Sequence, residues 1–152
     1  MVEYKDDSIF NATEQIITNT VNCVGAMGKG LALEFKKRYP EMFEEYKKLC
    51  NEGKIEIGIP WKWNHILNFP TKIHWRNPSH IRYIESGLNW IKNSYKDLGM
   101  KSIALPKLGC GNGGLEWEQV KVLIEETFKD VNDLKVVVYT KQENAEKLRN
   151  DI

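Results

Sequence analysis

Short β-rich runs alternate with segments of helical periodicity along this chain, and the alternation constrains the fold more than any other feature. The runs that predict strands are residues 1–5, 16–21, 55–59, 65–69, 103–106 and 135–140. Residues 135–140 are apolar at consecutive positions, as expected of a strand covered on both faces. Alternation of this kind predicts an α/β fold in which helices lie on both sides of one sheet.

Apolar residues at helical spacing predict the helices between these strands. Leu31, Phe35 and Tyr39 lie four residues apart, and Pro40 ends that segment. The further predicted helices cover residues 42–49, 81–98 (with Ser79 as N-cap and Gly99 beyond the end), 117–128 and 144–150. Because no repeat, low-complexity segment or linker interrupts the pattern, we expect residues 1–152 to form a single domain.

Charge and length narrow the class of protein further. The chain has 152 residues with 22 basic and 21 acidic side chains, a formal charge of +1. This balance excludes a polybasic nucleic-acid tail and an acidic disordered segment. Contact with a polyanion must therefore come from a local patch of charge.

The cysteines and histidines do not form a metal-binding pattern. Three scattered cysteines, without a CxxC or CxxH pair, indicate a reducing compartment and argue against disulfides or a zinc site. The three histidines also lack a ligand spacing, so we expect neither a metal nor a cofactor.

The chain has no predicted membrane segment. Asp6 and Asp7 occupy the place where a signal peptide needs an apolar run. No stretch approaches the roughly 20 apolar residues of a membrane span. We expect a cytoplasmic protein without membrane contact.

A first glycine-rich segment, residues 19–30, follows a predicted strand and opens a predicted helix. Gly25, Gly28 and Gly30 allow sharp turns and close approach of a ligand to the backbone. A helix N-terminus offers free N–H groups and a positive dipole end to an anion such as phosphate. The spacing matches neither the Walker A motif nor GxGxxG, and a loop that merely turns stays an alternative.

A second glycine-rich segment, residues 105–115, has the same context and four glycines within six residues. Ligands of open α/β sheets bind at the carboxyl ends of the strands, so the two segments can converge on one diphosphate. A nucleotide sugar would suit the span between them.

A third segment, residues 61–76, combines three of the five tryptophans with Lys62, Lys72 and Arg76 and contains no acid. Cations interleaved with aromatic rings are typical of single-stranded nucleic-acid grooves. Trp61 and Trp63 also fit one buried strand face, the reading we favour for that pair. Trp75 and Arg76, beyond the strand, are the better candidates for base contact.

In these segments the chain resembles the macrodomains, and among them the macrodomain of the DarG antitoxin type. The motifs are Asn-Thr-Val-Asn at 19–22 running into residues 24–30, Asn-Phe-Pro-Thr-Lys at 68–72 followed by His-Trp-Arg at 74–76, and residues 104–106 leading into 109–115. The resemblance covers residues 4–140. It implies a three-layer α/β/α macrodomain sandwich with a central mixed, mostly parallel sheet. It also implies a DNA ADP-ribosyl glycohydrolase that removes ADP-ribose from thymidine in single-stranded DNA after a DarT-type toxin has attached it.

The resemblance assigns the subsites residue by residue. Asp7 would accept a hydrogen bond from adenine, Tyr139 would lie against the ring, and Asn22 would touch the distal ribose or the thymine. The two glycine segments would hold the diphosphate from both sides. The residues assigned to ADP-ribose are Asp7, Ser8, Ile9, Asn22, Val24, Gly25, Ala26, Met27, Gly28, Lys29, Gly30, Thr71, Leu108, Gly109, Cys110, Gly111, Asn112, Gly113, Gly114 and Tyr139.

Lys72 matches the family's catalytic lysine. Cleavage of an N-glycosidic bond places negative charge on the departing imide nitrogen, and a fixed ammonium can offset that charge or donate a proton. Alternatively, a neutral Lys72 could attack the aldehyde of the opened sugar as a Schiff base. A neighbouring diphosphate favours the charged amine and hence the first role.

The chain also departs from related patterns. Most macrodomains carry Asn-Ala-Ala-Asn and a glycine triplet, whereas here Met27 and Lys29 interrupt the glycines. Glycohydrolases that act on protein carry an aspartate in the second loop, but this chain has no acid there before Glu116. We therefore do not expect a mechanism that uses a lysine–aspartate pair. Ester-linked ADP-ribose on protein is also a less expected substrate.

One question about the extent of the protein and two alternative functions stay open. DarG carries a C-terminal toxin-binding region that this sequence lacks, so we expect either an excised domain or a stand-alone hydrolase. A non-catalytic ADP-ribose-binding module would use the same binding residues. A hydrolase of acylated ADP-ribose would not need Trp75 and Arg76.

Overall fold

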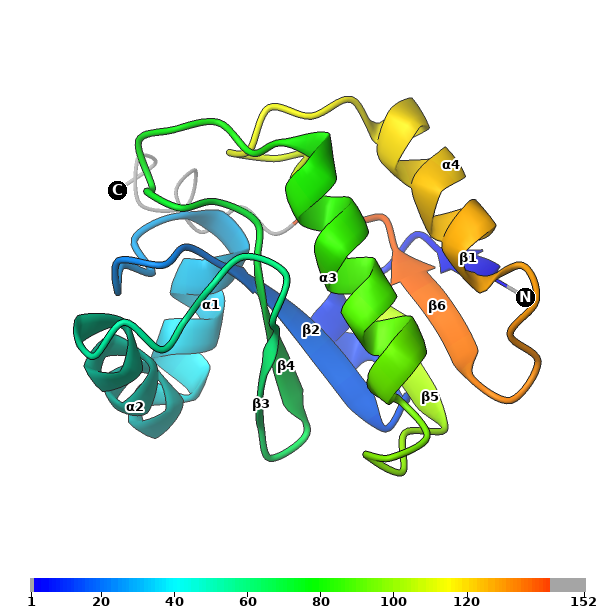
Figure 1. Ribbon diagram of the computed structural model, residues 1–152, viewed down its shortest axis with the longest axis horizontal. Helices are drawn as coiled ribbons and strands as arrows, with labels where there is room; N and C mark the ends of the chain where they lie inside the picture. Colours follow the sequence, from blue (N-terminus) through cyan, green and yellow to red (C-terminus); the bar gives the residue numbers. More distant parts are fainter. Residues whose placement is uncertain (1, 143–152) are drawn as a thin grey trace.

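The computed structural model describes residues 2–142 and shows one six-stranded sheet in the order β1-β6-β5-β2-β4-β3 (Figure 1). The strands are β1 (Val2–Lys5), β2 (Ile16–Val21), β3 (Trp61–Trp63), β4 (Ile66–Pro70), β5 (Ser102–Leu105) and β6 (Lys135–Tyr139). All neighbours pair in parallel except β3, which runs antiparallel to β4. The expected mixed, mostly parallel sheet is confirmed.

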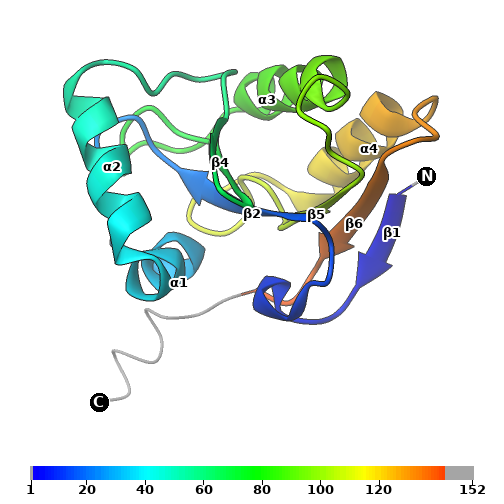
Figure 2. The same cartoon turned by 90° about the horizontal axis from the view of Figure 1, so that it is seen from below.

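Helices cover both faces of this sheet. Helices α1 (Gly30–Arg38) and α2 (Pro40–Asn51) lie on one face, and α3 (Ile81–Ser94) and α4 (Trp117–Phe128) lie on the other (Figure 2). The short 3₁₀ helix η1 (Ile9–Asn11) joins β1 to β2. Pro40 stands at the first turn of α2, where its missing N–H is tolerated, and so separates α1 from α2. Within residues 2–142, no helix has the length and apolar character needed to cross a bilayer.

The two faces of the sheet bury separate hydrophobic cores. Successive residues of β6 alternate between them: Val136 and Val138 pack under α3 and α4, while Val137 and Tyr139 pack toward α1 and α2. Each fully buried aliphatic side chain stabilises the fold by about 1.5–3 kcal/mol relative to an exposed one. Alternate burial on both faces explains the continuous apolar run in the sequence.

Three local predictions were wrong. Helix α3 ends at Ser94 and not at the predicted residue 98. Residues 55–59 form no strand of the sheet, because Gly58 (φ +86°) reverses the chain and Glu56 pairs only with Ile59 in an isolated bridge. Ser79 does not cap α3: its hydroxyl donates to the carbonyl oxygen of Thr71, and His80 is the N-cap residue. The helix predicted at 144–150 lies outside the described residues.

The parallel strands place four chain segments at one edge of the sheet. Strands β2, β4, β5 and β6 all point the same way, so the residues that follow their carboxyl ends meet there. These residues include the two glycine-rich segments and the segment that contains Lys72. The topology therefore brings the three segments singled out in the sequence to one place.

Candidate functional site

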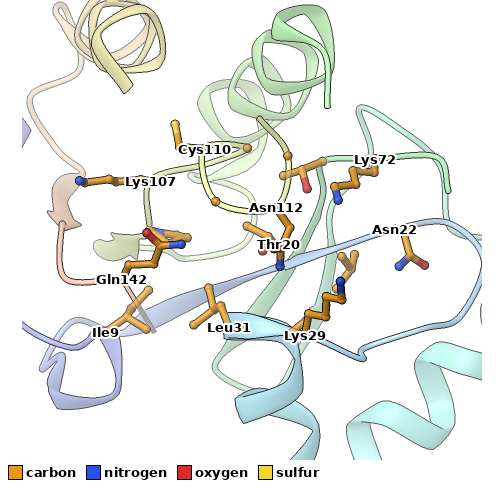
Figure 3. Close-up of a pocket in the computed structure, with 18 of the residues that line it drawn as sticks. Ile9, Thr20, Asn22, Lys29, Leu31, Lys72, Lys107, Cys110, Asn112 and Gln142 are labelled. Carbon is orange, nitrogen blue, oxygen red and sulfur yellow. The ribbon is translucent and has the colours of Figure 1, made fainter. Parts of the chain in front are cut away.

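A cavity of about 580 Å³ opens at this edge (Figure 3). It is lined from the ends of β2, β4, β5 and β6, from η1 and from the first turn of α1. Its lining residues are Ile9, Thr20, Val21, Asn22, Ala26, Gly28, Lys29, Gly30, Leu31, Ala32, Thr71, Lys72, Trp75, Pro106, Lys107, Gly109, Cys110, Gly111, Asn112, Gly113, Tyr139, Thr140, Lys141 and Gln142. The volume lies within the usual range for small-molecule sites.

Asn22 shapes the first glycine-rich segment. Its amide Nδ2 donates to the carbonyl oxygen of Ala26 at 2.8 Å, and its Oδ1 accepts from the N–H groups of Val24 and Ala26 at 3.1 and 3.3 Å. The buried hydroxyl of Tyr46, on α2, also donates to Asn22. Asn22 thus lines the cavity while its side chain holds the loop that leads to α1.

The first turn of α1 completes this side of the cavity. Lys29 is the N-cap residue, and Gly30, Leu31 and Ala32 line the cavity. The first N–H groups of an α-helix have no acceptor within the helix, and the helix dipole is positive there. The arrangement suits an anion, as predicted for this segment.

Backbone contacts within the second glycine-rich segment demand glycine. A Cβ atom on Gly113 would lie 2.3 Å from the carbonyl oxygen of Gly109, which no side chain can accommodate without moving the loop. The carbonyl oxygen of Gly113 accepts from the N–H of Ser79, and that of Gly109 accepts from the N–H of Leu115. The loop is therefore a closely packed wall of the cavity.

Lys72 is separated from the end of β4 by Thr71 and is half-buried. Its Nζ donates to the main-chain oxygen of Trp75 at 3.3 Å. Burial, with a smaller contribution from the charge of Lys29, lowers the pKa of the Lys72 amine below its usual range. Figure 3 shows Lys29 and Lys72 directed toward the same part of the cavity from opposite sides.

Charge in the cavity is of one sign. Among the described residues that line it, four are lysines (Lys29, Lys72, Lys107 and Lys141) and none is acidic. On a chain of nearly neutral formal charge, this is the local basic patch that contact with a polyanion requires. A ligand with two phosphate groups would offset the repulsion between neighbouring ammonium groups.

Trp75 and Arg76 form an exposed pair beside Lys72. Trp75 lines the cavity with 48% of its surface exposed, and the Arg76 guanidinium lies 4.8 Å from the centre of its ring. In contrast, Trp61 and Trp63 are half-buried against the core under α1 and α2, and Trp63 Nε1 donates to Glu45. The preferred interpretation of that tryptophan pair, one face of a strand, is confirmed.

The opposite end of the cavity contains Ile9 and Tyr139. The Tyr139 hydroxyl donates to Glu14 at 2.6 Å, and burial together with this carboxylate raises the pKa of Tyr139 to about 12. Asp7 lies next to this end but does not line the cavity. Its Oδ1 accepts from the Asn11 side chain and from the N–H of Ser8, and these bonds lower the pKa of its carboxyl group.

The structure brings most of the predicted binding residues to the cavity, with some exceptions. Those that do not line it are Asp7, Ser8, Val24, Gly25, Met27, Leu108, Gly114 and Arg76. Met27 and Leu108 are almost fully buried in the two cores. Their side chains therefore support the loops from beneath.

Further lining residues were not predicted: Thr20, Val21, Leu31, Ala32, Pro106, Lys107, Thr140, Lys141 and Gln142. Val21, Pro106 and Thr140 lie at the carboxyl ends of parallel strands, a signal that the sequence does contain. Gln142 has no such signal, because only the folding of the chain brings it beside the second glycine-rich segment. A Cβ atom added to Gly111 would lie 2.9 Å from Nε2 of Gln142. Across residues 2–142, no three His, Cys, Asp or Glu side chains gather in a group suited to a metal ion.

Comparison with known proteins agrees with the architecture. Residues 18–124 match the model of the Macro domain family. A DNA ADP-ribosyl glycohydrolase of Mycobacterium tuberculosis is 44% identical over 147 residues, which cover 91% of this chain and 42% of that protein. The chain thus spans about two fifths of the length of that relative.

Solved structures give the same result. The macrodomain of Mycobacterium tuberculosis DarG superposes with a TM-score of 0.87 at 43% identity, covering 92% of this chain and 97% of that one. Thermosipho africanus DarTG in complex with ADP-ribose superposes with a TM-score of 0.84 at 37% identity, covering 91% of this chain and 41% of that one. The sheet order, the helices on both faces and these matches together show that the chain belongs to the macrodomain family.

Proposed function

We propose that this chain binds ADP-ribose and hydrolyses the N-glycosidic bond between ADP-ribose and thymidine in single-stranded DNA. The observation that carries the proposal is that the two glycine-rich segments and Lys72 line one basic cavity. Its similarity to a DNA ADP-ribosyl glycohydrolase, and to a DarTG structure that contains ADP-ribose, supports the choice of ligand and reaction.

In this proposal the fold divides the substrate among the lining segments. The first turn of α1 and the loop at 109–113 hold the diphosphate, and Ile9 and Tyr139 flank the adenine end. Lys72 then lies at the distal ribose. As the glycosidic bond breaks, the sugar gains oxocarbenium character and the thymine nitrogen gains negative charge, which the ammonium offsets or protonates.

The lack of an acid among the described lining residues supports a mechanism with one lysine. A lysine–aspartate pair would need a carboxylate in the cavity, whereas Glu116 lies outside it. The negative charge on a departing thymine imide is delocalised over two carbonyl groups, so a single ammonium group can stabilise it. The proposed substrate is therefore compatible with one catalytic lysine.

Trp75 and Arg76 would contact the DNA next to the modified thymidine. An exposed ring at the mouth of the cavity can stack on a base, and the adjacent guanidinium can pair with a phosphate. Such a substrate requires an enzyme that attaches ADP-ribose to DNA, and a DarT-type toxin is the proposed partner.

Three substrates assayed side by side test the proposal: an oligonucleotide with ADP-ribosylated thymidine, an ADP-ribosylated protein and an O-acyl-ADP-ribose. We expect release of ADP-ribose and restoration of unmodified thymidine with the oligonucleotide, at a rate far above the other two. Binding of ADP-ribose without release from any substrate would instead identify a non-catalytic reader. Faster release from protein or from the acyl ester would assign a different hydrolase.

A further inference from the structure

The chain segment after Lys72 makes a turn that His74 holds together. The N–H of Asn77 donates to the carbonyl oxygen of His74 at 3.1 Å, closing a four-residue turn with Trp75 and Arg76 at its centre. The N–H of Arg76 donates to Nδ1 of the His74 ring, also at 3.1 Å. The imidazole thus accepts from the backbone two residues on, as the side chains of Asn and Asp do in Asx turns.

This turn fixes the surroundings of the Lys72 amine. The carbonyl oxygen of Trp75, at the centre of the turn, accepts the bond from Lys72 Nζ. The start of the turn is tied to the first glycine-rich segment, since the N–H of Cys23 donates to the carbonyl oxygen of Ile73 at 3.0 Å. Both the orientation of the amine and the exposure of the Trp75 ring therefore depend on the turn.

The contact with Arg76 specifies a protonation state for His74. A ring nitrogen that accepts a backbone N–H cannot carry a proton of its own. The turn as observed therefore requires the neutral ring with its proton on Nε2. A second proton would convert Nδ1 into a donor facing another donor, and the bond to Arg76 would be lost.

We propose that neutral His74 is a positioning residue, which holds the 74–77 turn so that the Trp75 carbonyl orients the Lys72 amine toward the cavity. The inference rests on the proposed function of Lys72 and adds a requirement to it. Full hydrolysis therefore requires an acceptor at position 74 for the Arg76 N–H.

Two substitutions separate the turn from the ring itself. In His74→Asn the side-chain oxygen can accept the Arg76 N–H. In His74→Ala nothing accepts it. We expect kcat of His74→Asn on the ADP-ribosylated oligonucleotide to stay within about threefold of wild type. We expect kcat of His74→Ala to fall at least about tenfold. The dissociation constant for free ADP-ribose should change less than about threefold in both.

Backbone NMR of the complete chain gives a readout independent of activity. The Arg76 amide hydrogen should exchange slowly with solvent in wild type and in His74→Asn, and much faster in His74→Ala, which leaves it without this acceptor. An unchanged kcat in His74→Ala, an equal loss of kcat in both variants, or an Arg76 amide that exchanges equally fast in wild type and His74→Ala would overturn the proposal. If wild type releases nothing from the oligonucleotide, the proposed function fails, and the exchange of the Arg76 amide alone decides whether His74 holds the turn.

Discussion

The hydroxyl oxygen of Tyr46 lies 2.8 Å from Oδ1 and 2.7 Å from the main-chain oxygen of Asn22, and so connects α2 to the loop after β2. Burial raises the pKa of Tyr46 well above its usual value, so the hydroxyl stays a donor. Asn22 in turn holds the N–H groups of Val24 and Ala26. A buried aromatic residue outside the cavity thus stabilises the conformation of one wall.

Tyr46→Phe should weaken both the fold and the site. Removing the hydroxyl leaves the main-chain oxygen of Asn22 without the Tyr46 donor, while Oδ1 keeps the N–H groups of Val24 and Ala26. The lost hydrogen bond destabilises the fold by about 1–3 kcal/mol. The affinity for ADP-ribose should fall several-fold because the loop at 22–26 loses its anchor. Chemical denaturation and calorimetry measure the two effects. Tyr39→Phe is the control, since the Tyr39 hydroxyl makes only an exposed 3.4 Å contact with His65; an equal effect in both variants would contradict this account.

Gly113→Ala should disrupt the second wall. The added methyl group would lie 2.3 Å from the carbonyl oxygen of Gly109, so the loop must move away from its present path. We expect a loss of at least about 1 kcal/mol in the free energy of unfolding and a tenfold or greater loss of ADP-ribose affinity, about 1.4 kcal/mol. Gly28→Ala provides the stability control because nothing lies within 4 Å of its added Cβ. Wild-type affinity in Gly113→Ala would show that this loop is not part of the binding site.

Binding of ADP-ribose should be accompanied by proton uptake above neutral pH. Burial and the charge of Lys29 lower the pKa of Lys72 in the unbound chain. A bound diphosphate favours the charged amine and moves its pKa back up. Between the two values, binding therefore draws a proton onto Lys72. Calorimetry at pH values just below the usual pKa of a lysine, in buffers of different ionisation enthalpy, measures this uptake. It should vanish in Lys72→Met; proton release, or the same uptake in that variant, would be inconsistent with the geometry.

Trp75→Ala combined with Arg76→Ala should separate DNA recognition from nucleotide binding. Loss of one stacking platform of about 1–3 kcal/mol should raise KM for the modified oligonucleotide at least about fivefold. The dissociation constant for free ADP-ribose should stay close to wild type. Lys62→Ala removes an exposed cation of the same segment outside the cavity and should leave both values unchanged. Equal losses on oligonucleotide and free ADP-ribose would refute a DNA contact at this rim.

The architecture was predictable because its physical causes are local. Consecutive valines at 136–138 require that both faces of their strand be covered. Pro40 separates two helices because proline lacks the N–H that a continuous helix would need there. The convergence of the glycine-rich segments followed from parallel strands, whose carboxyl ends share one edge. Lys72 was assigned from a resemblance, since a single lysine has no signal of its own.

The features that escaped prediction depend on tertiary contacts. The run at 55–59 has strand-like composition, but Gly58 turns it back on itself. Ser79 has the residue type of an N-cap, yet its hydroxyl bonds to Thr71 across a loop. Neither the contact of Tyr46 with Asn22 nor the approach of Gln142 to Gly111 has a spacing in the sequence that would indicate it.

Lys72→Met tests the central claim most directly, because it removes the charge and keeps the length of the side chain. The measurement pairs the rate of ADP-ribose release from the modified thymidine oligonucleotide with the dissociation constant for free ADP-ribose. We expect release to fall about a hundredfold or more while the dissociation constant changes by less than about fivefold. Release at the wild-type rate, with the amine absent, would contradict the assignment of Lys72 as the catalytic group.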